Sequence, residues 1–351
     1  MRKRAGGLLS VVISGVGGYL PSEEVTNGQV AERAGVSADW IAQRTGVRTR
    51  RRAAPDEATS DLAARAAEKA LASAGRRPEE LGLIVSATSL PDELGPSVAC
   101  RIQGGLGALN AVAMDVGAAC SGFLYALEVA RCWLHARPGA PPVLVVGAEV
   151  YSRFVDPADR GTASIFADGA GAVVLTTGDT GEGLAPIRLG ADGRGADLVG
   201  VFSGGTRRPA STGTVGSGEH TIRMNGRAIS DFTLRQFPLM VRECLEDNDL
   251  SLEDIALVVS HQPNPLLLKK AAAQAGIPED KIVITGDRVG NIGAGSVPFG
   301  LAHAQATGRL RHGDRVLLLA FGAGMTWGCG LLTWSGTAQE QHSENHQGGP
   351  S

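Results

Sequence analysis

Residues 79–86 read EELGLIVS, and residues 253–260 read EDIALVVS, a shift of 174 positions (260 − 86). A second apolar run at 143–147, VLVVG, resembles VLLLA at 316–320, a shift of 173 (316 − 143). Each run is short, continuous and rich in branched aliphatic residues, which is typical of a strand buried on both faces of a sheet. Two such pairs at nearly one shift predict two structurally equivalent halves. Chance similarity in a chain rich in Val, Leu and Ala is the alternative explanation.

Strand and helix signals alternate along the rest of the chain, which predicts an α/β fold with helices covering the sheets. The turn-rich stretch 177–183 is the natural junction, so the predicted halves are residues 1–179 and 180–335. Residues 336–351 are expected to be disordered, because the end of the chain is polar and poor in apolar residues. Under the same shift, the segment around Cys120 corresponds to 291–296, and the two turns are predicted to be related by a pseudo-twofold axis.

The composition excludes several classes of protein. Of 351 residues, 43% are hydrophobic and 20% charged, which predicts a globular protein with a sizeable core. A net charge of −3 argues against a dedicated nucleic-acid binder. No window reaches the roughly 18 apolar residues of a membrane span. Residues 7–20 are diluted by glycine and are interpreted as a buried strand at 8–13 followed by a glycine-rich turn, rather than as a signal peptide.

The cysteine pattern bears on location and on metals. Five widely spaced cysteines indicate a reducing cytoplasm rather than a disulfide framework. No Cys or His cluster has metal-ligand spacing, so no metal is predicted. The arginines at 48, 50, 51 and 52 have two open interpretations, a solvated loop or a group that holds a phosphorylated ligand.

Cys120 lies in a strand, tight turn and helix pattern at 113–134. Small residues surround it, and apolar residues at helical spacing follow it. A cysteine at a helix N-terminus is favoured as a thiolate, so its pKa is expected to fall below the ordinary value. The alternative is an inert thiol where helix and sheet pack closely. The other cysteines, at 100, 132, 244 and 329, are interpreted as inert.

From this segment outward, the chain resembles the β-ketoacyl-acyl-carrier-protein synthase III family over nearly its whole length. The segments that carry the resemblance are 15–21 (GVGGYLP), 40–48 (WIAQRTGVR), 115–127 (DVGAACSGFLYAL), 156–162 (DPADRGT), 166–172 (FADGAGA) and 320–328 (AFGAGMTWG). The resemblance implies a thiolase-like fold, with two pseudo-twofold-related halves in an α-β-α-β-α sandwich. It also implies a homodimer, acyl-CoA and acyl carrier protein as partners, and no cofactor.

The resemblance further implies that Cys120, His261 and Asn291 are the catalytic residues. Cys120 takes an acyl group from a thioester, and a malonyl thioester then loses carbon dioxide. His261, at the end of a buried strand, and Asn291 donate to the enolate oxygen that develops. The backbone N–H groups of Cys120 and Ala323 are expected to form the oxyanion hole for the tetrahedral intermediates.

Binding residues are implied in the same way. Trp40, Arg44 and Arg153 are expected to bind coenzyme A, with Trp40 and Arg153 at the adenine. Asn264 is expected to contact the pantetheine arm. A half-buried tryptophan and a surface arginine are the plain structural alternatives.

Three positions depart from the family pattern. Gly95 and Ser230 stand where many relatives carry bulky residues near the acyl pocket, which predicts a starter larger than acetyl. Leu266 replaces an arginine that docks the carrier, and Lys269 and Lys270 are possible substitutes. These departures indicate a polyketide-starter or other specialised-metabolism member.

The leading hypothesis is therefore decarboxylative condensation of acyl-CoA with a malonyl carrier protein. Its closest rival is transfer of the acyl group from Cys120 to an alcohol, amine or carrier without condensation, with His261 as general base. A non-catalytic partner subunit is a third reading, and retention of Cys120 argues against it. A cysteine hydrolase is disfavoured, because the chemistry requires the acyl group to be shielded from water.

Overall fold

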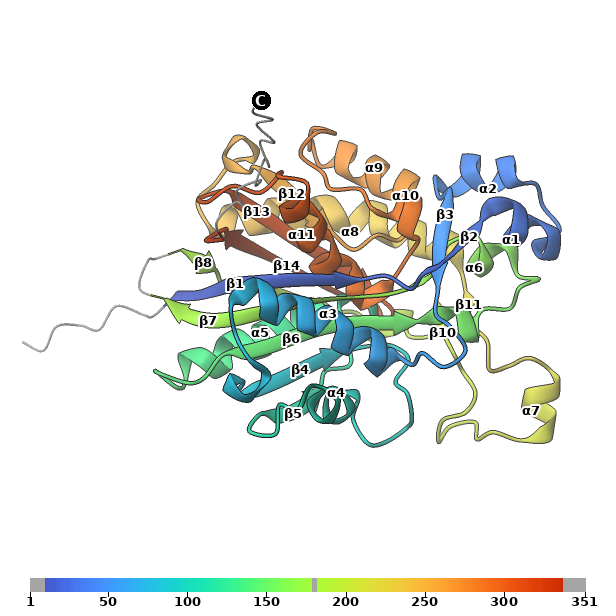
Figure 1. Ribbon diagram of the computed structural model, residues 1–351. Coiled ribbons are helices and arrows are strands. Elements are labelled where there is room, and N and C mark those ends of the chain that lie inside the picture. Colours follow the sequence, from blue (N-terminus) through green and yellow to red (C-terminus); the bar gives the residue numbers. More distant parts are fainter. Residues whose placement is uncertain (1–9, 179–181, 337–351) are drawn as a thin grey trace, which may run out of the picture.

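The computed structural model describes residues 10–178 and 182–336 (Figure 1). The first of its two large sheets has five strands in the order β1-β7-β6-β4-β5 and comes entirely from the earlier part of the chain. Its strands are β1 (Ser10–Tyr19), β4 (Leu83–Ala87), β5 (Val112–Asp115), β6 (Val143–Val150) and β7 (Asp168–Gly178).

The second sheet, from the later part of the chain, has the order β12-β13-β14-β8, and β9 also pairs with β14. Its strands are β8 (Gly183–Leu184), β9 (Arg188–Ala191), β12 (Leu257–Ser260), β13 (Arg315–Gly322) and β14 (Thr326–Thr333). The two smaller sheets pair β2 (Glu23–Thr26) with β3 (Thr49–Arg52) and β10 (Val199–Gly200) with β11 (Arg223–Met224).

The sequence repeat corresponds to one strand arrangement used twice. In the first sheet β4 runs parallel to β6, with Leu83 opposite Val143, and β7 returns antiparallel to β6. In the second sheet β12 runs parallel to β13, with Leu257 opposite Val316, and β14 returns antiparallel to β13. The 174- and 173-residue shifts therefore connect structurally matching positions, and the prediction of two equivalent halves is confirmed.

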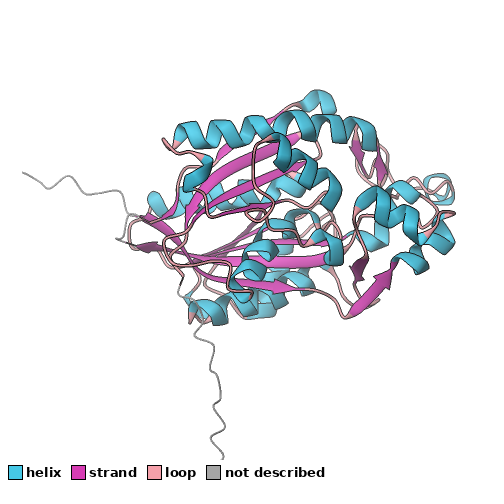
Figure 2. Cartoon of the chain, turned by 90° about the horizontal axis from the view of Figure 1, so that it is seen from above, coloured by secondary structure: helices cyan, strands magenta, loops and turns pink. Residues whose placement is uncertain are grey.

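Helices cover and separate the sheets. The α-helices are α1 (Asn27–Ala34), α2 (Ala38–Thr45), α3 (Thr59–Ala74), α4 (Val98–Leu106), α5 (Gly122–His135), α6 (Arg160–Ala163), α7 (Thr212–Gly216), α8 (Gly226–Asp247), α9 (Pro265–Gln274), α10 (Gly286–Val289) and α11 (Ser296–Ala306). Short 3₁₀ turns include η2 (Ala119–Ser121) and η6 (Gly293–Gly295), which directly precede α5 and α11. Seen from above, the strands run through the middle of the molecule and helices flank them (Figure 2).

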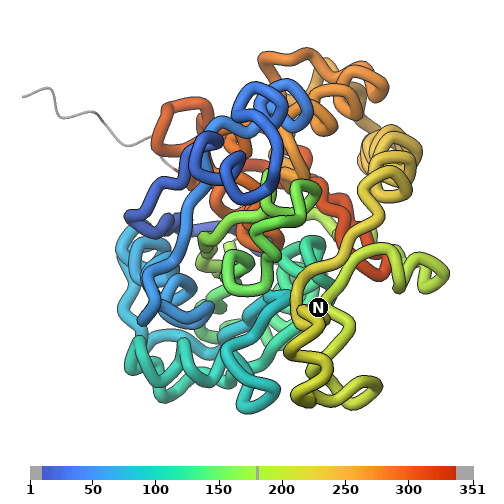
Figure 3. Tube along the Cα trace, turned by 90° about the vertical axis from the view of Figure 1, so that its right-hand side faces the viewer, coloured from blue at the N-terminus to red at the C-terminus, as the bar shows by residue number. Residues whose placement is uncertain are grey.

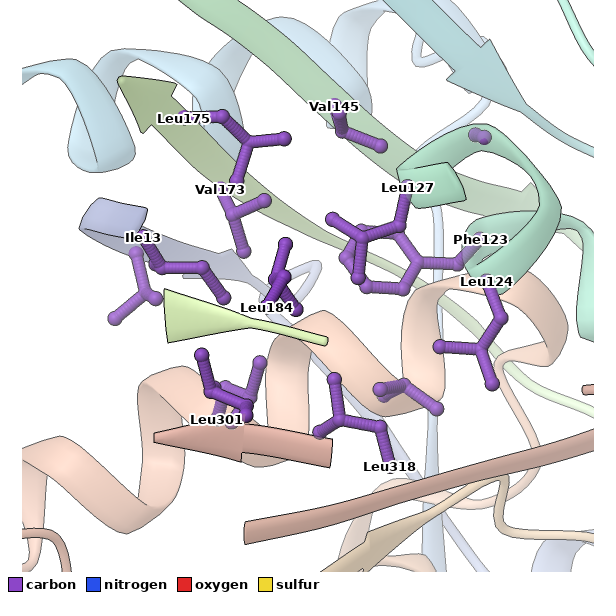
Figure 4. Packing of buried hydrophobic residues seen from close by; sticks show 14 of the residues in the cluster. Ile13, Phe123, Leu124, Leu127, Val145, Val173, Leu175, Leu184, Leu301 and Leu318 are labelled. Atoms are coloured by element: carbon purple, nitrogen blue, oxygen red, sulfur yellow. The ribbon is translucent and has the colours of Figure 1, made fainter. Parts of the chain in front are cut away.

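Three apolar clusters define the layers. Helices α3 and α4 pack on the outer face of the first sheet, around Ile84 and Leu144. Helices α8 and α9 pack on the outer face of the second sheet, around Val258 and Leu317. Between the sheets, α5 and α11 fill the central core, where Phe123, Leu127 and Leu301 meet strand residues of both sheets (Figure 4). The predicted α-β-α-β-α sandwich is therefore confirmed.

The prediction of a glycine-rich turn after residue 13 is wrong, because β1 continues through these glycines to Tyr19. The reason is the close approach of α3. A Cβ atom on Gly17 would lie 2.3 Å from the carbonyl oxygen of Ala66. Glycine thus lets the strand touch the helix backbone, which a sequence pattern alone does not distinguish from a turn.

Parts of the predicted boundaries are outside the described residues. The proposed division at 179/180 falls within 179–181, and the tail from 337 onward is likewise not described. In the described ranges, no helix is long and apolar enough to cross a membrane. These ranges also hold no group of three or more His, Cys, Asp or Glu side chains placed to bind a metal ion.

Candidate active site

A cavity of about 750 Å³ brings together Cys120, His261 and Asn291, which are far apart in the sequence. Cys120 comes from η2 of the first half, and His261 directly follows β12 of the second half. Asn291 follows α10, where its N–H donates to Ile165 O (2.8 Å) and its carbonyl accepts from Ala167 N–H (3.0 Å). The carboxyl ends of the core strands and the two turns before α5 and α11 therefore meet at one place.

The turn at Cys120 is held tightly against the second half. Ala119 adopts a left-handed conformation (φ 47°), which costs about 1–2 kcal/mol in a residue with a Cβ. The Ser121 hydroxyl donates to Ala118 O at 2.8 Å and lies 2.8 Å from the Thr326 hydroxyl, with which it also forms a hydrogen bond. A Cβ on Gly322 would lie 2.8 Å from the Cys120 nitrogen, so only glycine permits this contact. The end of β13 thus presents the following residue, Ala323, to the cavity beside the nucleophile.

The expected fall in the Cys120 pKa is contradicted by its surroundings. Burial of the thiol, and next the nearby Glu149 carboxyl, raise the pKa of Cys120 to about 12, although the Tyr151 hydroxyl and a backbone group act in the opposite direction. The turn at the helix start does not offset the loss of water around the sulfur. The thiol is therefore protonated at neutral pH and needs a group that takes its proton.

His261 and Asn291 form a hydrogen-bonded pair. Their Nε2 and Oδ1 atoms lie 3.1 Å apart, and Asn291 Oδ1 also accepts the N–H of Gly293 (2.9 Å). Because Oδ1 is the acceptor in both contacts, His261 carries its proton on Nε2 and the Asn291 Nδ2 group remains available as a donor. Burial lowers the pKa of His261 to about 4, so the imidazole is neutral at pH 7. The single N–H of the neutral imidazole is engaged by Asn291 Oδ1, so Asn291 Nδ2 is the donor that faces the cavity, and His261 Nε2–H joins it only by leaving Oδ1.

Helix α2 packs beside α9 (Figure 3). Trp40 and Arg44 of α2 and Asn264 before α9 line the cavity where these helices meet, which is called its mouth below, and their binding of coenzyme A stays a prediction. Asn264 caps α9, with Oδ1 accepting the N–H of Leu267 at 2.8 Å.

The prediction for Arg153 is contradicted by its position. Its side chain does not line the cavity and instead donates to the backbone carbonyls of Ala54 (2.9 Å), Pro55 (3.0 Å) and Glu57. Arg160, which the sequence interpretation missed, lines the cavity instead. Its guanidinium lies 5.4 Å from the centre of the Trp40 ring and lines the mouth.

The remaining predicted residues divide between the cavity and elsewhere. Ser230 on α8 lines the cavity, and so do Leu266 and Lys270. Lys269 instead pairs with Glu279 on the surface. Gly95 lies in the loop before α4 and does not line the cavity of this single chain.

The loop interpretation of the arginine cluster is wrong for its central members, whereas the interpretation that they hold a phosphorylated ligand stays a prediction, since Arg50, Arg51 and Arg52 line a small separate pocket of about 70 Å³. Residues 49–52 form β3, and Arg50 is buried, donating to Val25 O, Asn27 Oδ1 and Ser164 O. Arg51 and Arg52 pair with Glu24 and Glu23 on the adjacent strand. None of these arginines lines the cavity that holds Cys120, and their pairings support the β2–β3 sheet.

Glu149 and Tyr151 are polar groups at the nucleophile that the sequence interpretation also missed. The Tyr151 hydroxyl lies 3.4 Å from Cys120 Sγ, and Glu149 is fully buried at the end of β6. A carboxylate within an otherwise apolar strand at 143–150 is a signal that was present in the sequence, because an unpaired acidic residue is rarely buried.

Comparison with known proteins gives a consistent answer. Residues 114–193 match the family model "3-Oxoacyl-[acyl-carrier-protein (ACP)] synthase III", and residues 245–334 match its C-terminal counterpart. A β-ketoacyl-[acyl-carrier-protein] synthase III from Sphingopyxis alaskensis is 43% identical over 92% of this chain and 98% of its own.

Solved structures of similar proteins also match the fold of this chain. A 3-oxoacyl-(acyl carrier protein) synthase III from Pseudomonas aeruginosa has a TM-score of 0.85 and 39% identity, covering 93% of this chain and 98% of its own. The priming β-ketosynthase of a polyketide biosynthetic pathway has a TM-score of 0.87 and 30% identity, covering 96% and 99%. The chain therefore belongs to the β-ketoacyl-acyl-carrier-protein synthase III family.

Proposed function

We propose that this enzyme moves an acyl group from acyl-CoA to Cys120 and condenses it with malonyl-acyl carrier protein, releasing carbon dioxide and a β-ketoacyl thioester. The observation that carries the proposal is the meeting of Cys120, His261 and Asn291 in one cavity. The thiol is the nucleophile, Asn291 Nδ2 donates to the enolate oxygen, and His261 Nε2–H turns from Asn291 Oδ1 to the same oxygen when substrate binds.

The backbone completes the proposed site. The close approach of Gly322 to the Cys120 nitrogen, and the position of Ala323 on the cavity wall, support an oxyanion hole formed by the N–H groups of Cys120 and Ala323. Two backbone donors of this kind stabilise the oxyanion of the tetrahedral intermediates. Since nucleophile and oxyanion donors all come from the chain, we propose that the reaction requires no metal or organic cofactor.

The proposed coenzyme A site is the mouth of the cavity. Trp40 and the Arg160 guanidinium offer a flat pair of groups for the adenine, and Arg44, Arg227 and Lys270 add positive charge for phosphates. Among the described residues, none of these four cations forms an ion pair. The same cations, with Lys269 nearby, are proposed to bind the acidic surface of the carrier protein.

Arg160→Ala is expected to raise the KM for acyl-CoA about 5- to 30-fold with little change in kcat, because a partly desolvated cation–π contact and charge contribute about 1–2 kcal/mol. Steady-state kinetics at fixed malonyl carrier concentration measure this effect. Arg137→Ala is the matched control, since Arg137 stacks on Trp133 (3.7 Å) away from the cavity. Equal effects of both variants would contradict the assignment of Arg160.

The starter is proposed to be larger than acetyl, as in a polyketide-starter or other specialised pathway. The small Ser230 side chain on the wall of the large cavity supports this proposal. Gly95 contributes only if it reaches the cavity of a second copy, which depends on the proposed dimer.

The dimer is proposed to form along β5. This strand is the edge of the first sheet, with β4 as its neighbour. Nearby apolar side chains are exposed, with Leu94 at 91%, Leu109 at 76% and Val112 at 47%. An exposed edge strand with an apolar surround is a surface that a second copy covers by isologous pairing.

Leu109→Glu combined with Val112→Glu is expected to convert the dimer to monomers, because like charges would face each other across the interface. Light scattering after size exclusion gives the mass, and circular dichroism confirms that the fold is kept. An unchanged dimer mass would place the interface elsewhere.

A cytoplasmic location is also proposed, and the five cysteines, all free, support it.

The proposed function is tested with a panel of acyl-CoA thioesters. Intact mass records the acyl-enzyme, and malonyl carrier protein is then added to assay carbon dioxide and the β-ketoacyl product. Acylation followed by product supports condensation. Acylation without malonyl consumption would establish acyl transfer to another acceptor, and absence of acylation across the panel would contradict the proposal.

A further inference from the structure

A continuous chain of hydrogen-bonding groups runs from the nucleophile into the protein interior. Cys120 Sγ lies 3.4 Å from Tyr151 Oη, which lies 3.2 Å from Ser89 Oγ. Ser89 Oγ in turn donates to Glu149 Oε1 at 3.0 Å. The two hydroxyls can each donate in either direction, since a hydroxyl is both donor and acceptor. The thiol is thereby connected to a carboxylate through two rotatable O–H groups.

Glu149 has the surroundings of a proton acceptor. It is fully buried, and its carboxylate accepts from the Ser89 N–H (3.0 Å), Thr88 Oγ1 (3.1 Å) and the Ala294 N–H (3.4 Å). Within the described part of the chain it pairs with no Arg, Lys or His side chain. Burial, only partly opposed by these donors, raises the pKa of Glu149 to about 7.

Few titratable groups face this chain from the elements around it. The titratable groups are Cys120 from η2 and Glu149 and Tyr151 from β6 and the turn after it. The loop after β4 adds only the hydroxyl and N–H groups of Thr88 and Ser89, and η6 adds only backbone groups. His261, across the cavity, titrates near pH 4 and does not change charge between pH 6 and 8.

We propose that Tyr151 and Ser89 pass the Cys120 thiol proton to Glu149 when the cysteine attacks an acyl thioester. The sulfur proton moves to Tyr151 Oη, the tyrosine proton to Ser89 Oγ, and the serine proton to the Glu149 carboxylate. The thiolate then forms the C–S bond to the acyl carbon as the bond to the CoA sulfur breaks. The proton returns along the chain to that departing sulfur, so the reaction yields acyl-Cys120 and free CoA with no net proton change.

This arrangement explains how a thiol with such an unfavourable environment reacts. A thiolate beside an ionised Glu149 would place two negative charges in one buried site, which is why the carboxylate raises the Cys120 pKa. Transfer of the proton to Glu149 keeps one negative charge in the site and moves it onto sulfur. Cys120 and Glu149 therefore act as a coupled pair, and their titration belongs to both groups.

Proton acceptance by Glu149 and simple charge repulsion predict opposite effects of Glu149→Gln on the reactivity of Cys120. If Glu149 acted only through its charge, Glu149→Gln would make Cys120 more reactive. If Glu149 accepts the proton, the same variant makes Cys120 less reactive. The two outcomes are distinguished by the rate at which iodoacetamide alkylates Cys120, followed by intact mass from pH 6 to 9.

For the unchanged enzyme, the alkylation rate is expected to rise with pH through about 7, because Glu149 accepts a proton only after losing its own. In Glu149→Gln the rise centred near pH 7 is expected to be replaced by a slower rate that climbs steadily toward high pH, because solvent hydroxide must then remove the thiol proton. Alkylation of this variant is expected to be about 100-fold slower at pH 8 if the proton leaves in the same step as the attack. Tyr151→Phe is expected to slow alkylation about tenfold, and Ser89→Ala similarly, since each interrupts the chain. Faster alkylation or an unchanged pH profile in Glu149→Gln would overturn the proposal.

Structural damage is separated from loss of proton transfer by matched variants. Tyr151→Phe keeps the ring that packs on Phe166, with centroids 4.8 Å apart. Tyr125→Phe is the control, because its hydroxyl donates to Gly190 O away from the nucleophile. Acylation by acyl-CoA rests on the proposed function, whereas alkylation needs no acyl substrate. The proton path is thus tested even if the proposed substrates prove wrong.

Discussion

Cys120→Ala is expected to abolish the acyl-enzyme and to lower condensation by at least about 10⁴-fold, because no other group in the cavity takes the place of the thiol nucleophile. Intact mass after incubation with acyl-CoA shows the adduct directly. Cys132→Ala is the matched control, since Cys132 is exposed on the following helix and is expected to leave the adduct unchanged. A persistent adduct in Cys120→Ala would place the nucleophile elsewhere.

Cys120→Ala is also expected to keep decarboxylation of malonyl carrier protein. The donors for the enolate are His261 and Asn291, and neither depends on the sulfur. Carbon dioxide release without a lengthened chain would therefore separate the two half-reactions in one variant.

The second large effect is expected at those donors. His261→Ala or Asn291→Ala should lower decarboxylation about 10²- to 10³-fold each, which is the usual loss on removing one oxyanion donor. The acyl-enzyme should still form, because the chain from Tyr151 to Glu149 does not pass through either residue. Carbon dioxide release and intact mass measure the two steps separately.

Asn248→Ala serves as the control for Asn291, because Asn248 caps the C-terminal end of α8 and does not line the cavity. Loss of acylation and decarboxylation together in His261→Ala would instead indicate that the imidazole is the base for Cys120. That result would favour the acyl-transfer reading, in which His261 activates an acceptor.

The sequence predicted the parts of the fold that depend on continuous apolar runs. Strands β4, β6, β12 and β13 are buried on both faces over nearly their whole length, so each contains a continuous apolar run that is easy to recognise. The repeat then matched β4 with β12 and β6 with β13, because equivalent halves bury equivalent strands. Gly17 was misinterpreted for the converse reason, since its partner is the backbone of a helix that follows much later.

Orientation of long side chains was not predictable in the same way. Arg153 lies in a short 3₁₀ turn and Arg160 begins α6, and whether each side chain reaches the cavity depends on the path of the backbone between them. The Arg153 guanidinium donates to backbone carbonyls in residues 54–57, whereas the Arg160 guanidinium lies over the Trp40 ring. The ionisation of Cys120 was missed likewise, because burial and the neighbouring Glu149 are properties of the folded chain.

The contact of Gly322 with the Cys120 turn has a consequence for how substrates are selected. The two halves are joined there by the Ser121 to Thr326 hydrogen bond and by the buried core between the sheets. In the proposed function, a thioester therefore enters one cavity shared by both halves, with its head group at Trp40 and its acyl chain beside Ser230. Recognition of the carrier and measurement of chain length are then separate properties, and natural variation can change either one without disturbing the other.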